Sequence, residues 1–355
     1  MAQQHLGTVD GSLRGRTLKL GRAPGSMGIG AMEENVVIQA GECALAILPH
    51  LGGKIASLRV GAHELLQAPL APYAPRTRTI SFDAGDASGW DECLPSVAAC
   101  TVETVAGTAS IPDHGDLWRV GWTAGSEKGS GNKEQGAPGR AICFRGECFS
   151  LPLCLERTLT LNEADSGWRL SLNYTVTNTD NDPVPWSWAA HPLFTAEAGD
   201  RIVLPASINS LRLEGSGGNR LGNRGDQIIW PLATLADGTQ TDLSLAQPAI
   251  SGIGDKLFAG PLSASENCCS LVRAKLGLQI SVSFDPAATP YLGLWICYGG
   301  WPERPGPKQM CVALEPATAP VDSLALSGPW SRVLGPGESF SWPMFVEIQS
   351  VEGAD

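Results

Sequence analysis

The sequence predicts an all-β fold, and three observations support this prediction. First, 42 glycines and 26 prolines divide the 355 residues into short apolar runs, which is typical of strands separated by turns. Second, residues 168–177 alternate strictly between apolar and polar side chains, as in a strand with one buried face. Third, no segment carries an apolar stripe of helical period over three turns. We therefore expect a β-sandwich.

The chain is expected to contain one large domain. Residues 1–34 are rich in glycine and weakly patterned, so they are predicted to be an N-terminal extension. Residues 35–355 are predicted to form the sandwich, because no linker divides them. Within that domain, residues 123–140 carry many Gly, Ser and charged residues and predict a mobile loop between two strands.

Three later segments predict strands of the core. Residues 278–284 repeat the alternation of 168–177, and residues 291–298 are apolar on both faces, as in a strand covered on both sides. Residues 310–315 place Met310, Val312 and Leu314 on one face. Glu315 falls on the opposite face, at the predicted end of that strand.

Composition narrows the function. The net charge of −11, from 25 basic and 36 acidic residues, disfavours nucleic acid and anionic membranes as partners. The ten cysteines form no Cys-x-x-Cys motif, so we expect buried, reduced thiols. The N-terminus shows no apolar signal-peptide region, and no run of 18 apolar residues predicts a membrane span. A cytoplasmic protein is the expectation.

Three residues are the main catalytic candidates. His114 lies in Pro-Asp-His-Gly, where it could equally belong to a surface turn. His191 lies between Trp-Ala-Ala and Pro, where a core histidine and a functional one are equally expected. Glu315 has apolar neighbours, so we expect it to be partly buried with a raised pKa, as suits a base near pH 7. Such a set can move protons on and off oxygen without a cofactor.

Other polar and aromatic residues are candidates for contacts with a ligand. Arg157 shares a face with leucines, which favours a structural salt bridge slightly over a donor in a ligand pocket. Trp90 stands beside Asp91 and Glu92, and Trp118 follows another acidic residue. Aromatic rings beside carboxylates are typical of sugar sites, because a sugar has an apolar face and many hydroxyls. Alternatively, Trp90 closes the end of the sandwich.

The chain resembles the galactose mutarotase-like superfamily, which includes the aldose 1-epimerases, over roughly residues 40–350. Five segments carry the resemblance in order: residues 52–66, 112–115, 191–194, 255–258 and 314–316. The resemblance implies a single large β-supersandwich with few short helices and a sugar cleft on one concave sheet. It also implies that no metal or nucleotide cofactor is required.

The resemblance further implies roles for individual residues. Glu315 would take the proton of the C1 hydroxyl, His191 would protonate the ring oxygen, and His114 would hydrogen-bond the same oxygen region. Asp255 would hold sugar hydroxyls. The residues predicted to bind substrate are Asp255, Trp90, Asp91, Glu92, Trp118, Arg157 and Lys256, and no metal ligand is predicted.

One departure from the family pattern concerns an Asn-Arg pair that the mutarotases carry ahead of the first histidine. The corresponding residues 89–96 contain no arginine, so the expected substrate is not plain galactose. The candidates for that role are Arg157, Arg76 and Arg78, or Asp91 and Glu92 meeting different hydroxyls.

Three functions are therefore considered. The first is an aldose 1-epimerase-like mutarotase, which would interconvert the α and β anomers of a hexose or related sugar. The second is a carbohydrate-binding or sensing protein without turnover, which the missing Asn-Arg pair favours. The third is a sugar-phosphate epimerase, for which Arg76, Arg78 and Lys256 are the candidate phosphate ligands. The predicted partner is a small-molecule sugar, and the protein is expected to be a monomer or a homodimer.

Overall fold

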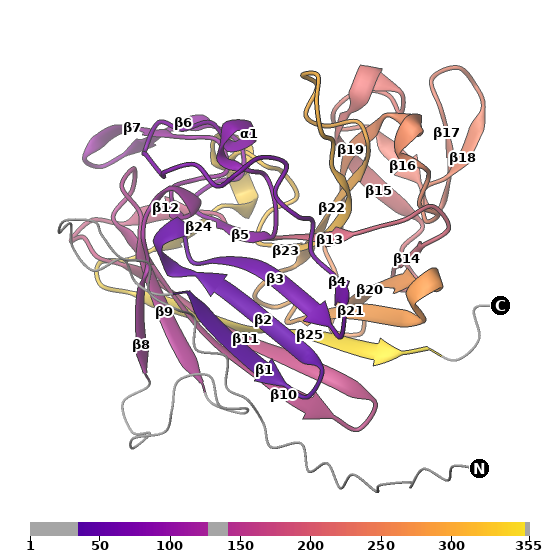
Figure 1. The fold of residues 1–355 in the computed structure, drawn as a ribbon. Coiled ribbons are helices and arrows are strands. Elements are labelled where there is room, and N and C mark those ends of the chain that lie inside the picture. The colour runs from indigo at the N-terminus through magenta and orange to yellow at the C-terminus, as the bar shows by residue number, and fades with distance from the viewer. Residues whose placement is uncertain (1–34, 127–140, 352–355) are drawn as a thin grey trace, which may run out of the picture. The chain divides into compact units, whose positions relative to one another are not determined.

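Two large antiparallel β-sheets pack face to face in the computed structural model of the chain, which describes residues 35–126 and 141–351 (Figure 1). The prediction of an all-β sandwich is confirmed. The predicted N-terminal extension, residues 1–34, lies outside the described residues.

The first sheet has eleven strands and brings together segments from most of the sequence. Its order is β1 (Val36–Ala40), β2 (Cys43–Leu48), β3 (Lys54–Val60), β5 (Trp90–Cys93), β13 (Ala189–Thr195), β23 (Met310–Ala317), β22 (Tyr291–Tyr298), β19 (Ile253–Ala259), β15 (Ser210–Ser216) and β16 (Gln227–Ile229), with β4 (His63–Glu64) paired to β3. The central neighbours β5, β13, β23, β22 and β19 are far apart in the chain, so only the completed fold can join their side chains in one site.

The second sheet has eight strands. Its order is β14 (Arg201–Val203), β20 (Cys268–Arg273), β21 (Leu278–Phe284), β25 (Ser339–Ser350), β11 (Gly167–Asn178), β10 (Leu153–Ala164), β9 (Ile142–Glu147) and β8 (Thr123–Ser126). The four strands predicted from the apolar pattern correspond to β11, β21, β22 and β23. The predicted loop at residues 123–140 is wrong at its start, because residues 123–126 form β8 and pair with β9. Residues 127–140 lie outside the described part of the chain.

Smaller elements complete the described fold. Two-stranded ladders join β6 (Cys100–Thr104) to β7 (Gly107–Ile111), β12 (Val184–Trp186) to β24 (Arg332–Leu334), and β17 (Leu232–Thr234) to β18 (Gln240–Asp242). Helical turns are α1 (Phe82–Gly85) and the 3-10 helices Pro49–Leu51, Leu117–Arg119, Gly217–Asn219, Ala249–Ser251, Ala274–Leu276, Leu324–Leu326 and Gly328–Trp330. Within residues 35–126 and 141–351, none of these helices has the length and hydropathy needed to span a bilayer.

The main core lies between the two sheets and follows from the alternation of strand side chains. On β11, Leu170, Leu172 and Tyr174 are fully buried, while the polar residues between them are partly or fully exposed. Burial of these apolar side chains supplies the main stabilising term. The ten cysteines, all within the described residues, are free and buried or half-buried, as predicted. Burial raises the pKa of Cys43 to about 12, so its thiol stays protonated and unreactive near neutral pH.

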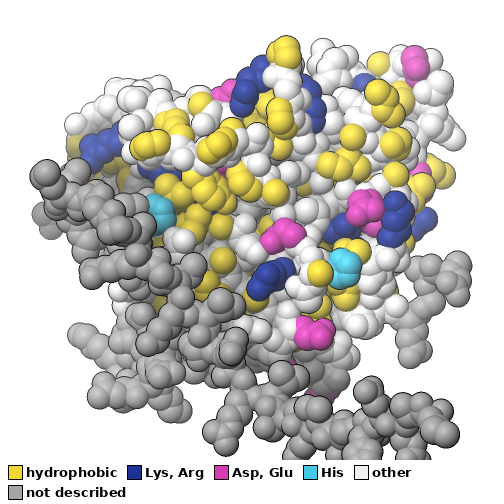
Figure 2. All heavy atoms as spheres, viewed as in Figure 1, with side chains coloured by type: hydrophobic (Ala, Val, Ile, Leu, Met, Phe, Trp, Pro, Cys, Tyr) yellow, Lys and Arg dark blue, Asp and Glu magenta, His cyan; other side chains and the backbone are white. Residues whose placement is uncertain are grey.

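The two faces of the first sheet have different chemistry because alternate residues point to opposite sides. On β13, Ala190 and Phe194 belong to the main core, whereas His191 and Leu193 point to the other face. That second face is not covered by the eight-stranded sheet, and it carries the candidate site. On the side of the molecule that Figure 2 shows, basic, acidic and hydrophobic side chains are intermixed.

Candidate active site

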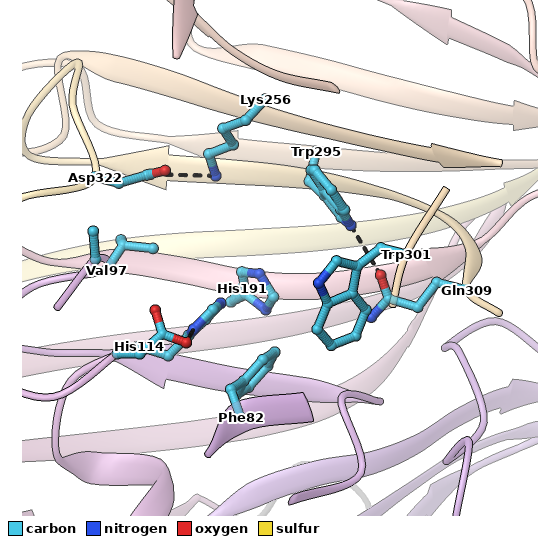
Figure 3. A pocket seen from close by; sticks show the side chains of 11 residues that line it. Phe82, Val97, His114, His191, Lys256, Trp295, Trp301, Gln309 and Asp322 are labelled. Atoms are coloured by element: carbon cyan, nitrogen blue, oxygen red, sulfur yellow. Dashed lines mark hydrogen bonds and ion pairs between the residues drawn. The ribbon is translucent and has the colours of Figure 1, made fainter. Parts of the chain in front are cut away.

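A cavity of about 280 Å³ lies on the second face of the first sheet. This volume is close to the lower end of the range of about 300–1,000 Å³ that is typical of small-molecule sites. The described residues that line it are Phe82, Val97, Ala98, Asp113, His114, His191, Lys256, Trp295, Trp301, Gln309 and Asp322 (Figure 3). The structure thus brings together two of the three predicted catalytic residues, His114 and His191, with Lys256.

A tight turn presents His114 to the cavity. His114 and Gly115 both have left-handed backbones, with φ of 58° and 68°. Gly115 is required there, because a Cβ at that position would lie 2.2 Å from the carbonyl oxygen of Leu94. The guanidinium of Arg119 donates to the carbonyls of Asp113 and Gly115, each at 2.5 Å. The turn is therefore fixed from behind, and its left-handed histidine is of the kind that concentrates at functional sites.

The His114 imidazole is oriented by two neighbours. Its Nδ1 lies 2.9 Å from Asp113 Oδ2, and it is the donor because a carboxylate only accepts. Burial alone raises the pKa of Asp113, but the hydrogen bond and charge of His114 outweigh it, so the pKa is lowered. The ring also stacks on Phe82, with ring centroids 3.7 Å apart. The hydrogen bond and the stacking together hold the His114 ring in one orientation beside the cavity.

His191 lies beside His114, with the two ring centroids 5.1 Å apart and nearly perpendicular. It is buried, with 6% of its surface exposed, and its Nδ1 has no hydrogen-bond partner among the described residues. Burial lowers the pKa of His191 well below its usual range, and the charges of His114, Lys256 and Lys54 lower it further. His191 therefore presents a neutral imidazole at neutral pH.

The opposite wall of the cavity carries a group of three charged residues, Lys256, Glu315 and Asp322. Lys256 Nζ contacts Glu315 Oε2 and lies 3.7 Å from Asp322 Oδ1. Burial raises the pKa of Glu315, although Lys256 opposes this. For Lys256 the two carboxylates outweigh burial and raise its pKa, so the ammonium stays charged. Glu315 is fully buried and does not line the cavity, because Lys256 lies over it.

Aromatic side chains form one end of the cavity. Trp295, on β22, donates from Nε1 to Gln309 Oε1 at 3.0 Å, and Trp301 lies beside this pair (Figure 3). The Gln309 amide in turn donates to the carbonyl of Ala87 at 2.9 Å. These contacts hold broad apolar surfaces next to polar groups, which suits a ligand with one apolar face and several hydroxyls.

Asp91 lies on the same face of the sheet as the cavity but belongs to a buried ionic cluster next to it. Lys54 Nζ bonds Asp91 Oδ2 at 2.5 Å and lies 3.3 Å from Asp86 Oδ1, and Arg76 bonds Asp86. Asp91 is the cross-strand partner of His191. Asp91 does not line the cavity, so its predicted contact with substrate is not supported. We assign Asp91 to the packing beside His191.

Five further predicted substrate-binding residues do not line the cavity. Glu92 and Arg157 form an ion pair at 3.0 Å between the two sheets. Arg157 therefore lies in a salt bridge, which is the first of the two positions considered for it. Trp90 also faces that core. Asp255 is fully buried and pairs with Arg220, on the face of β19 opposite to Lys256. Trp118 packs behind Phe82, with ring centroids 5.3 Å apart.

Sequence reasoning missed most of the other lining residues, namely Phe82, Val97, Ala98, Trp295, Trp301, Gln309 and Asp322. Asp322 had a signal, as the one charged residue in the apolar stretch after Glu315. Phe82 and Trp301 had none, because their place depends on how distant loops meet. The assembled site offers two imidazoles, an ammonium and two carboxylates around one cavity, which is a set suited to acid–base chemistry on a small polar molecule.

Comparison with solved structures identifies the fold as galactose mutarotase-like. The chain superposes on a galactose mutarotase-like protein from Lactobacillus casei with a TM-score of 0.60 at 18% identity, covering 89% of this chain and 100% of that one. A galactose mutarotase related enzyme from Lactobacillus acidophilus gives 0.60 at 16%, covering 91% and 100%. A galactose mutarotase-like protein from Clostridium acetobutylicum gives 0.58 at 15%, covering 89% and 95%. Comparisons with protein-family models and with curated proteins give no match.

Proposed function

We propose that the protein is an aldose 1-epimerase-like mutarotase, which interconverts the α and β anomers of a hexose or related sugar. The observation that carries the proposal is the pair of histidines facing Lys256 and Asp322 across one small cavity. The likeness of the fold to galactose mutarotase-like proteins supports it. The cytoplasmic location and the monomeric or dimeric state stay predictions.

The proposed reaction needs only proton transfers. A carboxylate of the Lys256 group takes the proton of the C1 hydroxyl, the C1 oxygen becomes a carbonyl, and the bond from C1 to the ring oxygen breaks. His114, which Asp113 holds in place, gives a proton to the ring oxygen, and the neutral imidazole of His191 lies beside it. Rotation about the C1–C2 bond presents the other carbonyl face, and the steps reverse. From the sequence, Glu315 is the base, but Lys256 would first have to leave its carboxylate.

Mutarotation of freshly dissolved sugars tests this function directly. Wild-type protein should accelerate the approach to anomeric equilibrium for at least one sugar of a panel, followed by polarimetry or exchange NMR. His114→Asn should bind that sugar and lose about 10²–10⁴ in rate, the contribution of one well-placed acid or base. A wild type that leaves every sugar at its spontaneous rate would contradict the proposal.

A carbohydrate-binding protein without turnover is the second candidate. Coverage of Glu315 by Lys256 favours it, because an ion-paired carboxylate is a weaker base. Sugar binding in a thermal-shift assay without acceleration of mutarotation would select this function. The sugar-phosphate alternative has less support, because the one cation among the described lining residues, Lys256, already contacts two carboxylates.

A further inference from the structure

Two carboxylates flank Lys256 beside the cavity, and they differ in access to it. The Glu315 side chain is fully buried, whereas 20% of the Asp322 side chain is exposed. Asp322 lines the cavity and Glu315 does not. A ligand in the cavity can therefore touch Asp322 without any movement of the protein.

Lys256 lies between these two carboxylates. Its ammonium contacts Glu315 Oε2 on one side and lies 3.7 Å from Asp322 Oδ1 on the other, with only 10% of the side chain exposed. Glu315 thus balances the charge of Lys256 from behind. To expose Glu315 to a ligand, the ammonium would have to leave a buried ion pair, which is costly.

The backbone of Asp322 is held firmly. The amides of Val97 and Ala98 donate to its carbonyl at 2.9 and 2.8 Å, and the hydroxyl of Ser96 donates to it at 3.1 Å. Its own amide lies 3.3 Å from Glu214 Oε1. These bonds fix the backbone that carries the carboxylate and so limit how far the carboxylate can move, as suits a group that transfers a proton.

We propose that Asp322 is the catalytic residue that accepts the C1 proton of the sugar, and that Glu315 is a positioning residue acting through Lys256. This inference rests on the proposed mutarotase function and assigns its base. In the step, the O–H bond at C1 breaks, a carboxylic acid forms on Asp322, and the electron pair makes the C1 carbonyl. The ring oxygen leaves C1 and takes a proton from His114, which Figure 3 shows across the cavity.

The first test compares two conservative variants with a matched control. Asp322→Asn should keep the fold and lose about 10²–10⁴ in kcat, while Glu315→Gln should lose less because it does not touch the sugar. Asp165→Asn, at an exposed hairpin of the second sheet, should match the wild type. Thermal unfolding of each variant checks that the fold is intact.

The pH profile separates positioning by Glu315 from a merely structural role. The charged groups facing Asp322 are Lys256 from β19, His114 from its turn, and Glu214 from β15 with its partners Arg212 and Arg224. Without Glu315, the charge of Lys256 acts more fully on Asp322 and favours its ionised form. The acid limb of kcat/KM, where the base must lose its proton, should therefore move to lower pH in Glu315→Gln.

The inference is overturned if Glu315→Gln abolishes turnover while Asp322→Asn keeps the wild-type rate. It is also overturned if the acid limb stays unchanged in Glu315→Gln. If the wild type accelerates the mutarotation of no sugar, the mutarotase function is contradicted. The affinity of the variants for any sugar that binds then tests whether Asp322 contacts the sugar. Asp322→Asn should then weaken the binding of that sugar by about tenfold, which is the contribution of one hydrogen bond to a charged group. Glu315→Gln should leave the affinity unchanged. Equal affinities would remove Asp322 from the sugar contact.

Discussion

Two buried ionic groups occupy opposite faces of the same sheet, and their bonding differs. In the core, both oxygens of Glu92 accept hydrogen bonds: Oε1 from Arg157 at 3.0 Å and Tyr174 at 2.9 Å, and Oε2 from Trp188 at 3.0 Å. At the cavity, Glu315 Oε1 is buried and accepts no hydrogen bond from any described residue.

The difference separates a carboxylate whose two oxygens are both hydrogen-bonded from one that is only partly bonded. Buried polar atoms are normally bonded, so one that is left unbonded calls for an explanation. Both carboxylate oxygens of the group between the sheets meet this requirement, whereas the buried Arg157 Nε has no hydrogen-bond partner among the described residues. Near the cavity, Glu315 Oε1 and His191 Nδ1 have no hydrogen-bond partner among the described residues.

The largest expected effect comes from breaking the group in the core. Arg157→Met removes the cation and leaves Glu92 buried, so the free energy of unfolding should fall by about 3–5 kcal/mol. Denaturant titration at pH 7 measures it. Arg145→Met is the matched control, because Arg145 pairs with exposed carboxylates near the same strand and should cost less than about 1 kcal/mol. Equal losses in both would contradict the comparison.

The corresponding change at the cavity should cost less and depend on pH. Lys256 is 10% exposed at the cavity, so in Lys256→Met water can reach Glu315, and we expect a loss of about 1–3 kcal/mol at pH 8. Burial already raises the pKa of Glu315, and losing Lys256 raises it further. In this variant, protonated Glu315 contributes stability that is fully present below pH 4.5, the usual pKa of the group. That stability is lost as the pH rises through the pKa of Glu315 in the folded state. Denaturation at pH 5 should thus show a smaller deficit than at pH 8; a deficit independent of pH would count against this account.

The smallest effect concerns His191. Its pKa in the folded state is lowered, mainly by burial, so below about pH 6.5 the unfolded chain takes up a proton that the folded chain refuses. This residue alone should lower the free energy of unfolding as the pH falls from 6.5, by at most about 1.4 kcal/mol per pH unit. His191→Asn should make the free energy of unfolding depend less on pH in this range. Parallel curves of this free energy against pH for the wild type and the variant would contradict the prediction.

Much of the fold was predictable because the apolar pattern of a strand, alternating or continuous, is a local property of the sequence. Residues 278–284 and 291–298 coincide with β21 and β22, and the apolar face around Arg157 indicated a buried salt bridge. The orientation of the side chains in segment 255–258 was harder to predict. Apolar residues at 257, 258 and 259 fit either face, so nothing local shows whether Asp255 or Lys256 points to the cavity. The order of strands in the sheet decides this, and it depends on pairings across the whole chain.

Strand β25 and the segment around Asp322 come late in the sequence, yet both are central. β25 pairs with β11 on one side and β21 on the other, and Asp322 supplies a wall of the cavity. During synthesis the earlier strands must wait for these residues before the second sheet can close. A nascent chain would therefore have no complete cavity until Asp322 and β25 have been synthesised. Ligand added to a refolding reaction would then bind only the finished molecule and draw the equilibrium toward it.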